Sequence, residues 1–270
     1  MSQAATGIVL GYNGSPQADL ALRWAGRTAA MQHLQLHVLI VATHMDPVVG
    51  HFREANDRLV EEWRTLAQRG LAREGVAASP IEIQRGPTGP VLVAAARSAT
   101  MLVVGSRGHG LAAGSLAGSV SQHLARHASC PVMVVRPPTD SAADRIVVGV
   151  DGSRESEAAL HFACERAALH GERVAVLHTY RAHSTTQERA ARLLDNYSAT
   201  FRGDFPKLVI DTLAVPGDPA EGLVEQSASA SLVAVGTRGR DAIAELSLGS
   251  VSQQLLHRAQ CPVAVVPQVR

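Results

Sequence analysis

The sequence predicts an α/β protein made of two tandem domains, each a doubly wound, mostly parallel sheet with helices on both faces. Motifs of the first half recur in the second at a constant offset of 131 residues (236 − 105), which carries Gly105 onto Gly236 and Gly118 onto Gly249. Apolar, strand-like segments alternate with helical ones, a pattern that predicts a parallel sheet. These segments are unbroken apolar runs, as expected of strands that are buried on both faces.

The length of the chain supports two domains. A chain of 270 residues favours two domains over one, and a repeat of half the chain indicates duplication rather than a solenoid, whose units run to roughly 20–50 residues. The proline-containing segment 137–144 breaks every periodicity. We therefore expect a first domain at residues 1–136, a linker at 137–144 and a second domain at 145–270.

Each half opens with an apolar strand, a tight turn and a helix. Taken alone, Asn-Gly at residues 13–14 and Asp-Gly at residues 151–152 predict a hairpin. The residues that follow overturn this interpretation, because Ser15 and Pro16 supply an N-cap and a first-turn proline. The second copy continues in the same way from Ser153, with acidic residues that suit a helix start.

The remaining elements are expected in the same order in both halves: a second strand, an amphipathic helix, a third strand, a short helix, a fourth strand, a helix after the glycine-rich loop, and a closing strand. In the first half they are Leu36–Thr43, Arg53–Arg73, Ile81–Gln84, Val91–Ser98, Met101–Val104, a helix ending near His127, and Pro131–Val135. In the second half they are Arg173–Tyr180, Thr185–Phe201, Leu208–Val215, Ala220–Ser229, Leu232–Val235, a helix ending near Arg258, and Pro262–Val266.

Composition excludes several classes of function. A formal net charge of +1 argues against a general nucleic-acid or membrane-surface binder. The start of the chain lacks a basic, apolar leader, and no apolar run approaches the roughly 18 residues of a membrane span. The cysteines and histidines form no metal-ligand or disulfide spacing, and Cys130 and Cys261 are expected to be small apolar fillers. We therefore expect a cytoplasmic protein without a metal site.

The glycine-rich loop that follows the fourth strand carries the chemistry. It reads Gly105–Gly108 and Gly236–Gly239, and nine residues later Gly118–Val120 and Gly249–Val251 open a helix. Glycines permit positive φ and close approach of the main chain, so that N–H groups converge on a phosphate. The helix start adds the positive end of its dipole. In doubly wound sheets ligands bind at this edge, beyond the carboxyl ends of the strands, and we expect the Asn13 and Asp151 turns at the same edge.

Several interpretations of these residues stay open from the sequence alone. The loop is either an anion site or a flexible connection, although its spacing is neither that of a Rossmann fingerprint nor that of a Walker A motif. The hydroxyls of Ser119 and Ser250 either cap the helix or donate to a phosphate. Asp151 forms an Asx turn, contacts a ligand, or does both. Arg107 and Arg238 either reach a phosphate or remain solvated.

Together the motifs resemble the ATP-binding subgroup of the universal stress proteins over nearly the whole chain. Both halves match its Gly-x2-Gly-x9-Gly-Ser/Thr pattern, and both close on Cys-Pro-Val. The family's opening Gly-x-Asp-Gly-Ser is complete at Gly149–Ser153, whereas Asn replaces Asp at Gly11–Ser15. Its Gly-Asp-Pro-Ala segment appears at Gly217–Ala220 but reads Gly-Pro-Thr-Gly from Gly86.

The resemblance implies a duplicated five-stranded domain, like those of the universal stress proteins and the adenine nucleotide alpha hydrolases, with one ATP in each half, alone or with Mg²⁺. It implies that the adenine lies near Val41 and Thr179, the ribose near the first loop glycine, and the phosphates on the helix start. The candidate ligand-binding residues are Gly11, Asn13, Val41, Gly105, Ser106, Arg107, Gly108, Gly118, Ser119 and Val120, and Gly149, Asp151, Thr179, Gly236, Thr237, Arg238, Gly239, Gly249, Ser250 and Val251.

Three functions are compatible with these features: an ATP-binding regulatory stress-response protein that is not an enzyme, a slow ATP hydrolase, and an interaction scaffold with no nucleotide. No acidic residue or histidine recurs in both halves as a water-activating base, which argues against hydrolysis. The resemblance also implies that the closing strands pair with each other in an intrachain pseudo-dimer, and a homodimer stays open. Because Asn13 stands opposite Asp151, we expect the two nucleotide sites to be unequal.

Overall fold

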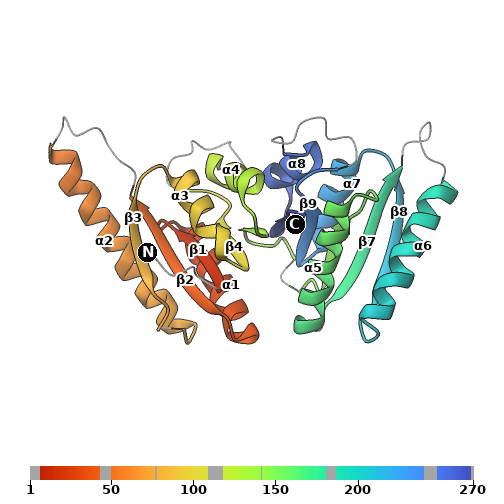
Figure 1. Cartoon of the computed structure of the whole chain (residues 1–270), viewed down its shortest axis with the longest axis horizontal. Helices are drawn as coiled ribbons and strands as arrows, with labels where there is room; N and C mark the ends of the chain where they lie inside the picture. Colours follow the sequence, from red (N-terminus) through yellow and green to blue (C-terminus); the bar gives the residue numbers. More distant parts are fainter. Residues whose placement is uncertain are drawn as a thin grey trace. The chain divides into compact units, whose positions relative to one another are not determined.

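The computed structural model describes residues 7–42, 50–76, 78–108, 118–140, 142–180, 187–239 and 248–268, the side chains of residues 50–55 excepted. The chain divides into two compact units, Met1–Arg136 and Pro137–Arg270. Figure 1 labels most of their helices and strands. The two units are described in turn.

The first unit repeats a strand–helix alternation from its start to its end. Its elements are β1 (Gly7–Tyr12), α1 (Pro16–Gln32), β2 (Gln35–Ala42), α2 (Gly50–Arg73), β3 (Ile81–Arg85), α3 (Thr88–Ala95) with a 3₁₀ turn (Ala96–Ser98), β4 (Met101–Gly105), α4 (Ser119–His127) and β5 (Val132–Val135).

The second unit repeats this order. Its elements are β6 (Arg145–Gly149), α5 (Arg154–His170), β7 (Arg173–Tyr180), α6 (Gln187–Asp204), β8 (Ile210–Pro216), α7 (Pro219–Gln226) with a 3₁₀ turn (Ser227–Ser229), β9 (Leu232–Gly236), α8 (Ser250–Arg258) and β10 (Val263–Val266).

Within each unit the strands form a parallel sheet in which the first strand is central. The order is β3-β2-β1-β4-β5 in the first unit and β8-β7-β6-β9-β10 in the second. From the central strand the chain adds two strands on one side, β2 and β3 or β7 and β8. It then crosses over and adds two strands on the other side, β4 and β5 or β9 and β10. The strand order therefore reverses between β1 and β4, and between β6 and β9, which is where doubly wound sheets bind ligands.

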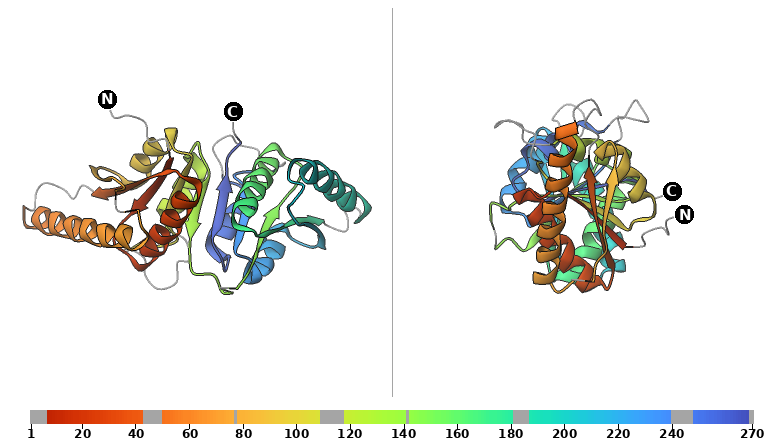
Figure 2. Two further views of the ribbon diagram at one scale, coloured as in Figure 1. Left: turned by 90° about the horizontal axis from the view of Figure 1, so that it is seen from below. Right: turned by 90° about the vertical axis from the view of Figure 1, so that its left-hand side faces the viewer.

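Helices cover both faces of each sheet, and the left-hand view of Figure 2 shows the strands lying between two helix layers. In the first unit α1 packs on α2, and α3 packs on α4. The four residues of β5 and of β10 are all buried, and β4 and β9 are buried almost throughout. Burial on both faces explains why these strands are continuous apolar runs instead of alternating ones.

The predicted fold class is confirmed, and most element bounds agree with the sequence to within a few residues. The fourth strands run one residue further than expected, to the first loop glycine. The second helix of the first unit begins three residues before the expected start, at Gly50, and that of the second unit continues three residues beyond the expected end, to Asp204. Thr43 and Thr185, which we expected in a strand and a helix, lie outside the described residues.

The helices that follow the central strands begin as the sequence predicts. The Ser15 and Ser153 hydroxyls each accept a hydrogen bond from the backbone N–H three residues later, at 3.2 Å in both helices. The two helices end differently. Both terminate in a left-handed residue, which is Gly171 in the second unit and His33, with φ of 53°, in the first.

The segment expected to be a linker belongs to the second compact unit. The backbone N–H of Thr139 donates to the carbonyl oxygen of Gln260 at 2.9 Å, and the Thr139 hydroxyl donates to the same oxygen at 3.2 Å. Asp140 accepts a hydrogen bond from the N–H of Ala142 through its side chain, at 2.9 Å. The described part of this segment is thus held by hydrogen bonds to Gln260, which lies between α8 and β10 of the second unit.

Candidate functional site

The site starts at the turn that ends each central strand. The Oδ1 atom of Asp151 accepts hydrogen bonds from the backbone N–H of Ser153 at 2.9 Å and from its hydroxyl. Asn13 makes the same pair of contacts with Ser15, at 3.3 and 2.8 Å. The Asx turn considered from the sequence is therefore present in both units. One side-chain oxygen holds the turn and orients the serine that caps the helix, which leaves the second side-chain atom to face elsewhere.

That second atom faces the glycine-rich loop. A Cβ atom added to Gly108 would lie 2.8 Å from Nδ2 of Asn13, and one added to Gly239 would lie 2.5 Å from Oδ2 of Asp151. A side chain at either glycine would thus collide with the turn residue. The turn after the central strand and the loop after the fourth strand therefore meet, as the sequence predicted from the shared edge of the sheet.

The loop glycines are needed for close approach rather than for an unusual backbone conformation. Positive φ among the described glycines occurs elsewhere, for example at Gly14 (70°) and Gly152 (85°), and not at the glycines of the loop. A Cβ on Gly105 would lie 2.7 Å from the backbone of Gln17, and a Cβ on Gly236 would lie 2.6 Å from Glu155. The expectation that these glycines supply positive φ is wrong for the described ones. They let the fourth strand pack against the first turn of α1 or α5.

Hydrogen bonds fix both ends of the loop. The N–H of Ser106 donates to Val135 at 2.9 Å, and the N–H of Gly118 returns to the Ser106 carbonyl oxygen at 3.2 Å. In the second unit the N–H of Thr237 donates to Val266 at 3.1 Å, and Gly249 donates to Thr237 at 2.8 Å. Ser106 and Thr237 are both buried. The first and last residues of the loop are thus held in the same way in both units, while residues 109–117 and 240–247 between them lie outside the described residues.

The helices that follow the loops begin without a side-chain cap. Their N-cap residues are Gly118 and Gly249, which have no side chain to accept from the first turn. Ser119 and Ser250 are the first helical residues and are exposed, so the interpretation of their hydroxyls as caps is wrong. The first N–H groups of a helix have no partner within it. Such N–H groups, together with the helix dipole, are suited to binding an anion.

The second serine of each helix has a structural role. Ser121 donates to the Gly118 carbonyl oxygen at 2.9 Å, and Ser252 donates to the Gly236 carbonyl oxygen at 2.6 Å. Both side chains are buried. The Ser252 bond ties the first turn of α8 to the end of β9, and the Ser121 bond closes the first turn of α4 on its own N-cap residue.

The residues expected near an adenine lie on the other side of the central strand. Val41 is buried near the end of β2, and Thr179 is half-buried near the end of β7. Both strands neighbour the central strand on the side away from the glycine loop. The candidate residues of each unit therefore span three adjacent strand ends. Arg107 is exposed and Arg238 half-buried, and the structure leaves their roles open.

Gly11 and Gly149 have a packing role under α3 and α7. A Cβ on Gly11 would lie 3.0–3.1 Å from Leu92 and Val104. A Cβ on Gly149 would lie 2.7 Å from Leu223. These two glycines allow the short helix to pack close to the central strand. An added side chain at either position would be directed toward that helix and not toward the glycine-rich loop.

Sequence reasoning missed two residues at this edge. Trp63 on α2 lies against Gly14, where an added Cβ would collide with its indole ring. His178, beside Thr179 on β7, shares a hydrogen bond of 2.7 Å between its Nδ1 and the Val150 carbonyl oxygen, which orients the ring. The position of His178 near the end of β7 could have indicated it, whereas Trp63 lies in the middle of α2 and carries no such signal.

The thiols and other candidate metal ligands take no part in the described site. Burial raises the pKa of Cys130 to about 11 and that of Cys164 to about 12, so both remain protonated thiols. Within the described ranges no three His, Cys, Asp or Glu side chains cluster as a metal site would require. In the same ranges no helix combines the length and the hydropathy needed to cross a membrane.

Comparison with known proteins places this architecture in one family. The universal stress protein family model matches residues 6–136 and again residues 142–267. The chain is 32% identical to universal stress protein Rv2623 of Mycobacterium tuberculosis over 284 residues, which cover 96% of this chain and 95% of the relative. It is also 32% identical to universal stress protein Rv2005c of the same species, over 97% of each chain.

Solved structures support the same fold. A crystal structure of a universal stress protein from Archaeoglobus fulgidus superposes with a TM-score of 0.75 over 99% of this chain and 100% of that one, at 17% identity. Two matches to the family model, together with relatives similar over nearly their full length, settle the classification. The chain belongs to the universal stress protein family, with two tandem copies of its domain.

Proposed function

We propose that this universal stress protein binds one adenine nucleotide in each unit, with ATP as the physiological ligand, and acts as a regulatory protein rather than an enzyme. The observation that carries the proposal is the duplicated helix start. In both units a glycine N-cap leaves the first N–H groups of α4 or α8 uncapped, beside a loop whose ends are fixed by hydrogen bonds. This arrangement suits phosphate oxygens, which accept from N–H groups without needing a lysine.

The proposed residues divide by the part of the nucleotide they would contact. The main chain of the loop and the helix start would bind the phosphates, and the exposed Ser119 and Ser250 hydroxyls would donate to them. Asn13 and Asp151 would face the ribose or the phosphates, because their second side-chain atoms already point toward Gly108 and Gly239. In the second unit the Asp151 carboxylate could also hold Mg²⁺, which prefers oxygen ligands and retains water.

The absence of catalysis is part of the proposal and rests on the same comparison of the two units. Asp151 faces Gly239 in the loop of the second unit, and its Oδ1 atom already accepts two hydrogen bonds from Ser153. The first unit has an amide at the same place. A general base must be available to accept a proton from water, and an amide cannot do so. We also propose a cytoplasmic location, where ATP is present and where free, buried cysteines are usual.

Mass spectrometry of the small molecules released from gently purified protein tests this function. The proposal predicts adenine nucleotide, at up to two molecules per chain. Protein that purifies without nucleotide and does not take up added ATP would favour a nucleotide-free interaction scaffold. Turnover of ATP faster than about one per minute would favour a hydrolase, since enzymes commonly work at about 1–1000 per second.

A further inference from the structure

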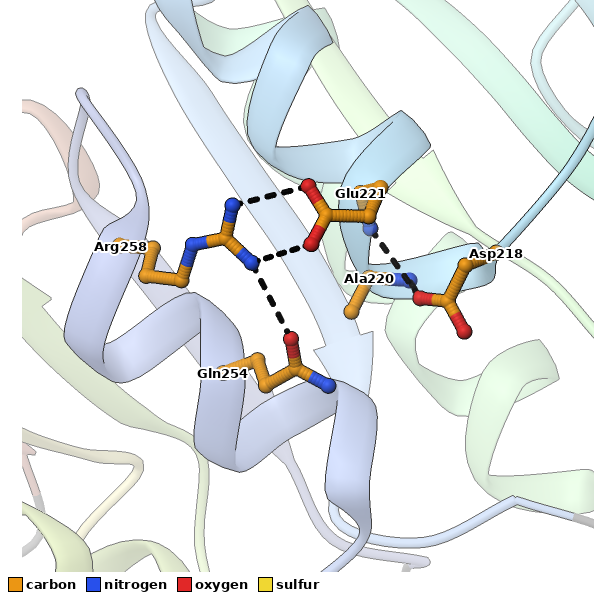
Figure 3. A network of polar contacts seen from close by, with 5 residues as sticks. All are labelled: Asp218, Ala220, Glu221, Gln254 and Arg258. Carbon is orange, nitrogen blue, oxygen red and sulfur yellow. Dashed lines mark hydrogen bonds and ion pairs between the residues drawn. The ribbon is translucent and has the colours of Figure 1, made fainter.

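The helix that follows the glycine-rich loop contacts the preceding short helix through different side chains in the two units, α4 against α3 and α8 against α7. In the second unit Arg258, at the end of α8, donates to both carboxylate oxygens of Glu221 on α7, the second bond measuring 2.8 Å. The same guanidinium donates to Gln254 one turn earlier, at 3.3 Å. Figure 3 shows this network beside Asp218, which caps α7 through the N–H groups of Ala220 and Glu221. Arg and Glu both keep their charges between pH 5 and 8.

The first unit has no counterpart of this ion pair. The repeat offset of 131 residues places Pro90 where the second unit has Glu221, His123 where it has Gln254, and His127 where it has Arg258. Proline carries no charge, so the end of α4 has no carboxylate to bind on α3. The contact between the two helices is made instead by His123, whose Cδ2 atom would lie 2.6 Å from a Cβ on Gly89.

The two histidines also contact each other. Their ring centroids are 4.5 Å apart, with the planes inclined at 46°. His123 is half-buried, because the missing side chain of Gly89 lets its ring lie against α3, whereas His127 is exposed. If both rings carried a proton, two like charges would lie within van der Waals contact of each other at the end of one helix.

In the described part of the chain, α3 and β5 make the most extensive contacts with α4. Neither α3, with the sequence TGPVLVAA, nor β5, with the sequence VMVV, contains a titratable side chain that could offset these charges. The charged group that acts on His123 besides His127 is Arg126 on α4 itself, which is also positive. Burial, His127 and Arg126 all lower the pKa of His123 below its ordinary value.

The sign of the pH effect follows from this lowered pKa. Because the folded chain has the lower His123 pKa, the unfolded chain binds the proton more readily as the pH falls through about 6.5. Stability contributed by this contact is therefore complete above that pH and is lost as the pH falls below it. The Arg258–Glu221 contact does not titrate in this range, so the second unit serves as an internal control.

We propose that the His123–His127 pair makes the α3–α4 contact a pH-sensitive joint, so that mild acid loosens α4 and weakens the first nucleotide site but not the second. The joint itself follows from the contacts of the two histidines. Its consequence for nucleotide rests on the function proposed above, because α4 carries the N–H groups that would bind phosphate. A stress protein built in this way reports acidity as a change in the occupancy of one of its two sites.

Hydrogen–deuterium exchange on the full chain tests the joint without reference to nucleotide. Exchange is measured at pH 7.5 and 5.5 and corrected for the intrinsic rate, on peptides from α3–α4 and from α7–α8. The α3–α4 peptides should lose protection at pH 5.5, and the α7–α8 peptides should keep theirs. In the double variant His123→Gln/His127→Gln, which cannot titrate there, the loss should disappear. A matched control, His37→Gln on β2, should leave the loss unchanged.

Equal protection of α3–α4 at both pH values overturns the joint, and so does the same loss of protection in the double variant. Calorimetric titration with ATP at the two pH values then tests the link to nucleotide. Protonation of ATP itself affects both sites, so the informative quantity is the ratio of the two affinities, which should shift against the first site in acid. A constant ratio refutes the link. Absence of ATP binding at both pH values refutes the proposed function while leaving the exchange result intact.

Discussion

At the residue scale, Asn13 and Asp151 occupy one position of the repeated fold with different chemistry. Both hold the turn through a single oxygen, so exchanging them should not change the local backbone. The atom that faces the loop is an amide nitrogen in the first unit and a carboxylate oxygen in the second. A carboxylate can accept charge-assisted hydrogen bonds from the nucleotide or hold Mg²⁺, and such bonds are roughly twice as strong as neutral ones.

We therefore predict that, with Mg²⁺, the second site binds ATP more tightly than the first by about 1–2 kcal/mol, or roughly five- to thirtyfold. Titration of the wild type, Asn13→Asp and Asp151→Asn with ATP measures the difference. Asn13→Asp should tighten the first site and Asp151→Asn should weaken the second, and chelation of Mg²⁺ should reduce the gap. Two equal sites in the wild type, or weaker binding in Asn13→Asp, would mean that the carboxylate mainly repels the phosphates.

His33 provides a second comparison at this scale. It ends α1 in a left-handed conformation, with φ of 53°, at the position where α5 ends in Gly171 with φ of 68°. A side chain in this conformation costs about 1–2 kcal/mol, partly offset because glycine loses more chain entropy on folding. His33→Gly should thus raise the free energy of unfolding by about 0.5–1 kcal/mol in urea titrations, and Gly171→His should lower it by a similar amount. A destabilising His33→Gly would show that the imidazole makes a compensating contact.

At the scale of elements, the short helix before the fourth strand is capped in one unit only. Asp218 accepts the N–H groups of Ala220 and Glu221 at 2.9 and 3.3 Å, whereas Pro87 begins α3 with no side-chain cap. Loss of such a cap typically costs about 1 kcal/mol. We predict that Asp218→Ala destabilises the protein by about that amount and that Pro87→Asp stabilises it, both measured by equilibrium unfolding. Unchanged stability in both variants would show that packing alone determines where these helices start.

The sequence was sufficient to predict the helices and strands and which of the turns and loops lie at the same edge of the sheet. Hydrophobic periodicity and turn residues determine both. The turn at Asn13 and the loop at Gly108 were expected at one edge, and the structure brings them together. The role of the loop glycines was not predictable, since glycine is equally suited to positive φ and to close packing. The position of Trp63 over Gly14 depends on how α2 lies against the sheet, which the pattern of its own residues does not determine.

At the scale of the whole molecule, each unit has its own core and its own sheet, and each sheet ends in a short apolar strand. Within its own unit β5 pairs with β4, and β10 pairs with β9, which leaves the other edge of each closing strand without a partner in that unit. An unpaired apolar edge tends to associate. We propose that β5 and β10 satisfy each other in an intrachain pseudo-dimer.

This proposal predicts that residues 1–136 and 137–270, expressed separately, each self-associate. Analytical ultracentrifugation over a range of concentrations measures the association. A charged residue in place of Met133 or Ala264 would disrupt the core as well, so the separate halves are the cleaner test. Halves that stay folded and monomeric at high concentration would rule the arrangement out.

The central claim is that each unit holds one nucleotide at its glycine loop and helix start, and counting bound nucleotides by native mass spectrometry tests it most directly. Gly118 and Gly249 have φ of −71° and −60°, which valine also adopts. An added Cβ would lie 3.7 Å from the nearest atom at Gly118 and 3.2 Å from the Thr237 carbonyl oxygen at Gly249, so Gly118→Val should keep the fold and Gly249→Val should keep it after a small shift of the loop, while each places a side chain at the proposed phosphate site. Gly203→Val, where an added Cβ meets nothing within 4 Å, is the control. The account predicts two ATP molecules per chain in the wild type and in the control, one in each single loop variant, and none in the double variant. No bound ATP in the wild type, or two ATP molecules retained by a loop variant, would contradict it.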